Sequence, residues 1–378
     1  MTDKRIQKKL IPLLRIALGT ASEPVALTDE DCAFLLNTAK RQSIIPLLWA
    51  GLRRQECPEE LRRRVDELRV RDFYDYAMRE HAFKTLCAAF EEAEIPYLPL
   101  KGSVIKDLYP EPWMRTSCDI DILVHEEDLD RALSAIESKT DFIVGERDFH
   151  DVSLVNRQVH FELHFSIKEN MENIDALLKD VWRYAVKCPD SFRYRLTPEF
   201  QIFHILAHMS YHLKRGGLGI RPYLDLWLLR GKTSYDEELL RGMCESCGIL
   251  TFYEKSCDML RVWMEGAPCT PELETLETVC FAGAVYSSTE YAGAAVLRES
   301  VGLRYLMRRL FVSRAVLEEL YPMLRGRPYL LPVCQVRRWL RIFQPKHQTL
   351  IRKELRDVQK IEKQDIKEFD SFLKTMGL

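Results

Sequence analysis

Apolar residues recur at three- and four-residue spacing through the first ninety positions, and this is the period of amphipathic helices. Thr28, followed three residues later by Asp31, predicts an N-cap of the capping-box kind for one of these helices. Residues 58–93 keep a single helical pattern, and Pro58 suits its first turn. The pattern therefore predicts an N-terminal helical region over residues 1–94.

The pattern changes after residue 94, where short apolar runs separated by turn residues replace the helical period. Residues 95–100 are apolar and interrupted by prolines, which is typical of an edge strand that enters a turn. Residues 119–124 alternate between polar and apolar, which predicts a strand. Further strands are expected at 142–144, 152–155 and 158–165, and a helix is expected at 126–138. We therefore predict a small mixed sheet over residues 95–168, with helices on one face.

Helical patterns return after Thr197-Pro198, a pair that suits an N-cap followed by a proline at the first helical position. They predict a helical region over 169–297 that closes a cleft against the sheet, and a further helical region over 298–378. The predicted fold class is therefore α+β, with a small mixed sheet flanked by N-terminal and C-terminal helical regions.

The composition fits a soluble protein with large cores. The chain has 378 residues, of which 47% are hydrophobic and 30% charged, so two or three packed units are expected. No run of 18 apolar residues occurs, and the eleven cysteines form no even framework at short spacing. These features predict a cytoplasmic protein with reduced thiols and no membrane span.

The net charge of −2 conceals a basic C-terminal region. Residues 298–378 hold 18 Lys and Arg against 9 Asp and Glu, a net charge of +9. Its arginines, with Tyr and Trp nearby, raise the hypothesis of RNA binding. Solvated helices, docking onto the acidic remainder of the chain, or an anionic membrane surface explain the same charge.

Asp119 and Asp121 are the most informative residues of the sequence. They stand two positions apart on a predicted strand, so their carboxylates project from the same face. Adjacent anions repel unless a cation lies between them, and Mg²⁺ suits such a site, with Mn²⁺ as an alternative. Glu162 is acidic within a second apolar strand and is a candidate third ligand if the two strands are neighbours. The three carboxylates could hold two Mg²⁺ about 4 Å apart. Solvated strand-end acids are the simpler alternative.

Gly102 and Ser103 precede the acidic pair in an order that favours phosphate binding. A strand, a glycine turn and a short helix would place backbone N–H groups where phosphates can be received. The Ser103 hydroxyl could donate to the same oxygens. The DxD strand follows sixteen residues after Ser103.

This arrangement resembles the nucleotidyltransferase superfamily typified by DNA polymerase beta, and it resembles the bacterial uncharacterised nucleotidyltransferase family more closely. The resemblance covers about residues 10–280 and rests on the segments 100–103, 107–110, 119–124 and 162–164, together with Arg115. Glu162 stands where members of the superfamily more often have Asp.

The resemblance implies roles for individual residues. Asp119 and Asp121 would bind two Mg²⁺, and Gly102 and Ser103 would hold the triphosphate. Glu162 would bind the metal on the nucleophile side and help to activate an acceptor hydroxyl. The cations nearest in sequence that could neutralise phosphate charge are Lys101 and Arg115.

The residues of a candidate cleft come from the later helices. His204, His208 and His212 are spaced by four and share one helix face. They could bind a metal, contact the nucleotide or acceptor, or be structural. Arg221 and Asp225, also spaced by four, predict a local ion pair, or residues of the cleft wall.

The function predicted from these features is transfer of a nucleoside monophosphate from an NTP, ATP above all, to an acceptor with release of pyrophosphate. The acceptor could be a small hydroxylated molecule, a protein side chain or an RNA end. A non-catalytic nucleotide-binding or interaction protein on the same fold is the alternative.

Overall fold

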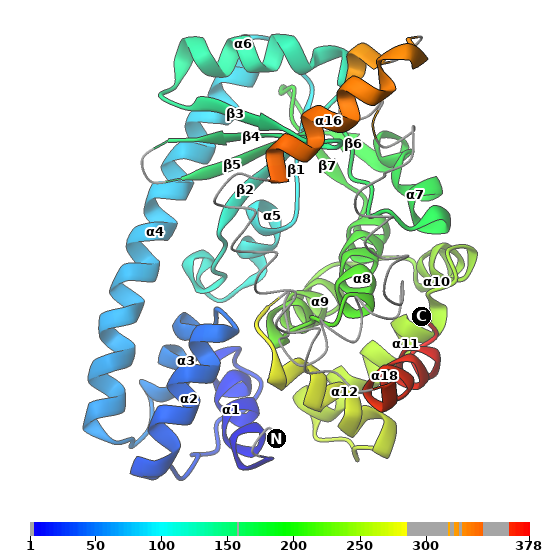
Figure 1. The fold of residues 1–378 in the computed structure, drawn as a ribbon. Coiled ribbons are helices and arrows are strands. Elements are labelled where there is room, and N and C mark those ends of the chain that lie inside the picture. The colour runs from blue at the N-terminus through cyan, green and yellow to red at the C-terminus, as the bar shows by residue number, and fades with distance from the viewer. Residues whose placement is uncertain (1–3, 157–158, 286–316, 318–320, 325–326, 343–362) are drawn as a thin grey trace.

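A five-stranded mixed sheet lies between two sets of helices, as the α+β prediction requires (Figure 1). The computed structural model describes residues 4–156, 159–285, 317, 321–324, 327–342 and 363–378. The strands are β1 (Tyr97–Pro99), β2 (Asp119–Val124), β3 (Ile143–Arg147), β4 (Asp151–Val155), β5 (His160–His164), β6 (Ala185–Lys187) and β7 (Tyr194–Leu196). The helices are α1 (Lys4–Ala17), α2 (Asp29–Arg41), α3 (Ile45–Leu52), α4 (Glu59–Glu92), α5 (Gly102–Ile105), α6 (Leu129–Lys139), α7 (Glu172–Leu178), α8 (Pro198–Lys214), α9 (Ile220–Lys232), α10 (Glu237–Ser246), α11 (Leu250–Leu260), α12 (Pro271–Ala282), α16 (Leu331–Ile342) and α18 (Lys363–Thr375).

The strand order of the sheet is β1-β2-β5-β4-β3. β2 and β5 are parallel neighbours, and the other pairs are antiparallel. Alternation along β2 sends Ile120, Ile122 and Val124 into a core formed with α4 and α6. The opposite face of β2 carries Asp119 and Asp121, so the polar face of the sheet is turned away from these two helices.

Helix α4 takes part in two hydrophobic cores. Leu61 and Val65 near its N-terminus pack in the helical core, whereas Phe83 and Phe90 near its C-terminus pack against the sheet. Figure 1 shows α4 running the length of the molecule beside both parts. The long helical pattern of residues 58–93 is therefore explained by one helix that serves two cores.

The helical core joins the two ends of the sequence. Most of its buried side chains come from α1–α3 and from α8–α12 and α18, which lie on either side of the sheet unit in the sequence, and the sheet unit adds a few, such as Leu100 and Leu123. The fully buried Gln42 connects the two sets: its side-chain amide donates to the carbonyls of Cys280 and Gly283 at 2.8 Å and accepts from the Ile220 N–H at 2.8 Å. The N-terminal helices therefore cannot be separated from this core without exposing a buried amide.

Most of the predicted elements are confirmed. The strands expected at residues 95–100, 119–124, 142–144, 152–155 and 158–165 correspond to β1 to β5, and the helix expected at 126–138 to α6 with a preceding turn. The hairpin of β6 and β7 was not predicted, because its strands are short and mostly exposed. The region boundaries at 94, 168 and 297 stay predictions.

Two predictions from the sequence, the absence of a membrane span and RNA binding by the C-terminal region, can be compared only with the residues that the structure describes. None of the described helices has the length and apolar character needed to cross a membrane. Several arginines that motivate the RNA hypothesis, Arg304, Arg308, Arg309 and Arg314, lie outside the described residues. The last helix, α18, packs Phe369, Phe372 and Leu373 into the helical core.

Gly51 allows α1 and α3 to pack closely. A Cβ at this position would lie 2.5 Å from the Leu13 carbonyl oxygen, so Gly51→Ala must push the two helices apart. We expect a loss of about 1–3 kcal/mol in the free energy of unfolding, measured by urea denaturation. Gly242→Ala in α10 is the matched control, because a Cβ there meets nothing within 4 Å. It should stabilise the protein by up to about 1 kcal/mol. Equal effects of the two substitutions would contradict the packing.

Candidate active site

Three carboxylates converge on the polar face of the sheet. The parallel register of β2 and β5 sets Asp121 opposite Glu162, and Asp119 precedes Asp121 on the same face. The prediction that Glu162 can approach the Asp pair through neighbouring strands is therefore confirmed. One oxygen of Asp121, one oxygen of Glu162 and one ring nitrogen of His164 lie within 4.8 Å of one another. Asp119 forms a similar group with His160 and Glu162.

A cavity of about 350 Å³ opens over these carboxylates, between the sheet and helices α8 and α9. Its wall includes four basic residues: Lys101, Arg115, Lys168 and Arg221. Of the residues predicted from the sequence, Lys101, Gly102, Arg115, Asp119, Asp121, Glu162, His204, His208, His212 and Arg221 line this cavity, whereas Ser103 and Asp225 do not. The fold thus brings most of the predicted residues to one place.

The electrostatics of the site favour a cation between the carboxylates. Burial and the negative charges of Asp121 and Glu162 raise the pKa of Asp119. Burial also opposes ionisation of Asp121, but Lys101 and a hydrogen bond from His164 hold its pKa well below the usual range. Burial disfavours the charged form of His164 too, yet Asp121 and Glu162 raise its pKa to about 9. Positive charge is therefore stabilised here.

The glycine turn is held by close packing. Lys101 has a φ of +41°, which a residue with a side chain adopts only under strain, and it directs its charge into the cavity. A Cβ on Gly102 would lie 2.2 Å from a guanidinium nitrogen of Arg115, so a side chain at this position would displace that buried guanidinium. The Ser103 N–H donates to the Leu100 carbonyl at 3.1 Å. Ser103 itself lines a small adjacent pocket that Gly102 and Asp119 also line.

Asp225 pairs with Arg115, 110 residues earlier in the sequence, and the local pair predicted with Arg221 is therefore wrong. Arg115 donates to the Asp225 carboxylate through Nε at 3.2 Å and through Nη2 at 2.9 Å, with both side chains almost fully buried. Tyr109 donates to the same carboxylate at 2.8 Å. Arg221 instead donates to the Thr116 carbonyl at 3.0 Å. The fork of Arg115 is thus used mainly to join the glycine turn to α9.

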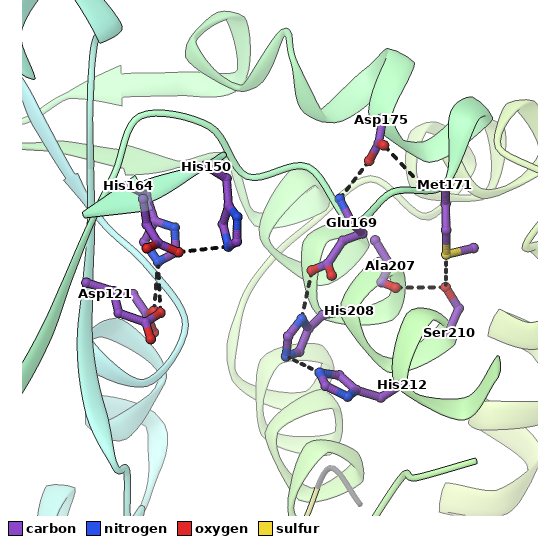
Figure 2. A network of polar contacts seen from close by, with 12 residues as sticks. Asp121, His150, His164, Glu169, Met171, Asp175, Ala207, His208, Ser210 and His212 are labelled. Carbon is purple, nitrogen blue, oxygen red and sulfur yellow. Dashed lines mark hydrogen bonds and ion pairs between the residues drawn. The ribbon is translucent and has the colours of Figure 1, made fainter. Parts of the chain in front are cut away.

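The histidines of α8 form the opposite wall of the cavity. Figure 2 shows Glu169, His208 and His212 linked in a chain that faces Asp121 and His164. Nδ1 of His208 lies 2.7 Å from a Glu169 oxygen and carries the hydrogen, because a carboxylate only accepts. The two Nε2 atoms of His208 and His212 are 3.1 Å apart. Glu169, buried in this contact, was missed in the sequence because no motif or period singles it out.

Burial keeps these histidines neutral. Burial, together with the charge of Lys101, lowers the pKa of His204 to about 3 and that of His208 well below its usual range. Burial and His208 lower the pKa of His212 to about 2. The cavity therefore has a charged sheet side, a wall of neutral imidazoles on α8, and the Arg221 cation on α9.

The donor set suits a divalent cation. Asp119, Asp121 and Glu162 offer carboxylate oxygens within one cavity, and a cation among them would relieve their mutual repulsion. Among the described residues, the groups of three ligand-type side chains all lie on β2, β4 and β5 or next to them. The histidines of α8 are not in these groups, so the metal role considered for them has no support here.

The comparison with protein families is decisive for the class of the chain. The family model described as "Uncharacterised nucleotidyltransferase" matches residues 28–265, which is more than half of the chain. The chain belongs to this family. No curated protein and no solved structure matches the chain. The family segment includes the sheet, the glycine turn and α8 and α9, and so it includes the whole cavity.

The Arg115–Asp225 pair provides a stability test. Asp225→Ala leaves the Arg115 guanidinium buried without its carboxylate, and we expect a loss of about 3–5 kcal/mol in the free energy of unfolding, measured by urea denaturation. The double variant Arg115→Met, Asp225→Leu removes both charges and should lose less. A single variant that is as stable as the wild type would show that the pair does not hold the turn.

The neutral histidines predict a pH dependence. In the unfolded chain His204 gains a proton below about pH 6.5, whereas in the folded protein it stays neutral to about pH 3. Folding stability therefore falls as the pH drops from 6.5 toward 5, by up to about 1.4 kcal/mol per pH unit for this residue. His204→Leu should flatten the slope of unfolding free energy against pH by that amount. An unchanged slope would contradict a neutral buried His204.

Proposed function

We propose that the chain is a metal-dependent nucleotidyltransferase that moves a nucleoside monophosphate from an NTP to an acceptor and releases pyrophosphate. The observation that carries the proposal is the convergence of Asp119, Asp121 and Glu162 beneath a cavity whose wall also holds basic side chains. Membership of a nucleotidyltransferase family supports the same reaction. An NTP carries the negative charge that such a wall would neutralise.

The carboxylates are proposed to hold Mg²⁺, with two ions as the full complement. When bound, the metal neutralises charge on the phosphates and on the oxygens that attack and leave. Lys101 faces the same cavity and adds a fixed positive charge beside Asp121. Arg221 is anchored on Thr116 and adds a second. These cations orient the triphosphate within the cavity and disfavour orientations in which it is exposed to water.

The chemical change is an in-line displacement at the α-phosphorus. The acceptor oxygen forms a new bond to phosphorus while the bond to the pyrophosphate oxygen breaks, and pyrophosphate leaves with its electron pair. We assign acceptance of the hydroxyl proton to Glu162, because 29% of its side chain is accessible whereas Asp121 is buried. Because Gly102 has no Cβ, the guanidinium of Arg115 can pack directly against the turn.

The helix side of the cavity is proposed to receive the acceptor. Its neutral groups, His208 and His212 together with Tyr211 and Asn170, suit hydroxyl and amide partners better than phosphates. The Glu169 carboxylate fixes the ring of His208, so this wall is organised before any ligand binds. A small hydroxylated molecule fits this description, and a protein side chain or an RNA end are the other acceptor classes.

Binding of Mg²⁺-ATP tests the proposal without knowledge of the acceptor. Asp119→Asn with Asp121→Asn should abolish Mg²⁺-dependent binding of a nonhydrolysable ATP analogue in equilibrium dialysis. It should also reduce pyrophosphate release from each of the four NTPs by about 100-fold or more. Asp130→Asn, an exposed carboxylate of α6, is the matched control and should leave both unchanged.

The outcomes separate the proposed reaction from its rivals. Lack of Mg²⁺-nucleotide binding by the wild type would overturn the proposal. Binding without pyrophosphate release in the presence of candidate acceptors would favour a non-catalytic nucleotide-binding protein. Nucleotide mass added to the protein itself, detected in the intact mass spectrum, would favour a protein acceptor.

A further inference from the structure

Strand β5 places a histidine on each side of Glu162 and on the same face of the sheet. His160 and His164 are the register partners of Asp119 and Leu123 on β2. Period two therefore brings two imidazoles to the edges of the carboxylate cluster. Each belongs to a group of possible metal ligands, but His164 is the more buried of the two and lies closer to Glu162.

His164 is directed into the carboxylates. Its Nε2 lies 3.0 Å from an oxygen of Asp121 and 3.5 Å from an oxygen of Glu162. Its side chain is only 5% exposed, so the ring is held in this direction by its surroundings. One cation placed among these three atoms would have two oxygen ligands and one nitrogen ligand from the protein.

His160 is engaged elsewhere. Its Nε2 contacts the Ser153 hydroxyl at 2.8 Å, and its Nδ1 is 3.8 Å from the nearest Glu162 oxygen. Its side chain is 39% exposed, so water competes for the ring. His160 therefore shares strand and face with His164 and lies within 4.8 Å of Asp119 and Glu162, but its ring is more exposed and its Nε2 is held by Ser153.

The second ring nitrogen of His164 points away from the Asp121 and Glu162 carboxylates. Nδ1 of His164 is buried and has no hydrogen-bond partner among the described residues, a state that costs about 1–3 kcal/mol. Asp151 is the register partner of His164 on β4. A carboxylate oxygen of Asp151 lies within 4.8 Å of one ring nitrogen of His164, and it also pairs with His150 at 2.9 Å. Metal-bound histidines commonly donate their second N–H to a carboxylate, a contact that Asp151 lies near but does not make in this structure.

We propose that His164, once its Nε2 proton is released, is a ligand through Nε2 of the cation held by Asp121 and Glu162, and that Asp151 is the positioning residue whose carboxylate accepts from Nδ1 when the cation is bound. The proposal rests on the proposed function only in placing a cation at this cluster. Imidazole nitrogen is a good ligand for Zn²⁺ and Co²⁺, and Mn²⁺, although it prefers oxygen, accepts it more readily than Mg²⁺ does. The site should therefore favour these ions over Mg²⁺ more strongly than three carboxylates alone would.

Pulsed electron paramagnetic resonance of Mn²⁺ bound to the full-length protein tests the proposal directly. The wild type should show a nitrogen coupling to the Mn²⁺, and labelling the histidines with ¹⁵N should change it. His164→Ala and the closer replacement His164→Gln should both lose this signal. Each should weaken Mn²⁺ binding about tenfold or more while changing Mg²⁺ binding less. His160→Ala is the matched control and should keep the nitrogen signal.

Asp151→Asn tests the positioning role. It should keep the nitrogen coupling and weaken Mn²⁺ binding by about 10-fold, within the range seen for outer-shell partners of metal-bound histidines. Unchanged Mn²⁺ affinity in this variant would remove Asp151 from the proposal. Circular dichroism of each variant checks that the fold is retained, and His164→Gln preserves a polar side chain should His164→Ala not fold.

The result that would overturn the proposal is Mn²⁺ bound to the wild type with no nitrogen coupling, or a coupling that survives in both His164 variants. Loss of coupling in His160→Ala alone would assign the ligand to His160 and would also overturn it. These results leave nucleotide binding and pyrophosphate release untouched. Failure of the inference is therefore distinguishable from failure of the proposed function.

Discussion

The parallel pairing of β2 with β5 is the interaction on which the site depends. It sets Asp121 beside Glu162 and leaves the apolar side chains of both strands to the core beneath. Placing carboxylates side by side costs free energy through repulsion and desolvation, and the surrounding structure has to offset that cost. Lys101 and His164 supply the compensating charge. The strained turn at Lys101 places its charge beside Asp121, and Gly102 lets that turn pack against Arg115.

Each of the two buried cores positions one side of the site. The sheet core fixes the carboxylates, and the helical core fixes α8 and α9, which supply the facing wall. The Arg115–Asp225 pair ties one to the other, because Arg115 follows the glycine turn and Asp225 belongs to α9. The cavity thus lies at the interface between the sheet core and the helical core, and ligands commonly bind at such interfaces.

Sequence periodicity predicted the elements well where one face of a strand or helix is buried. Asp119 and Asp121 could be found because the alternation of β2 is strict, and Glu162 because an acid interrupts an apolar strand. Asp225 was assigned the wrong partner, since spacing along one helix cannot reveal a cation 110 residues away. Glu169 and Asp151 gain their importance only from the loop and the register that bring them to a histidine. Those are tertiary facts, which local pattern does not encode.

The discontinuous helical core has a consequence for how the chain reaches its fold. The sheet core draws its buried residues from one stretch, 82–163, so its contacts close loops of modest length. The helical core needs residues 10–65 to meet partners that follow residue 167, with Gln42 bonded to Cys280 and Gly283. Joining such distant segments slows folding unless the intervening chain is already compact, because the loop-closure entropy is lost before the contacts form. The sheet unit is therefore expected to fold first during synthesis. The N-terminal helices can complete their core only later, when the C-terminal helices have been synthesised.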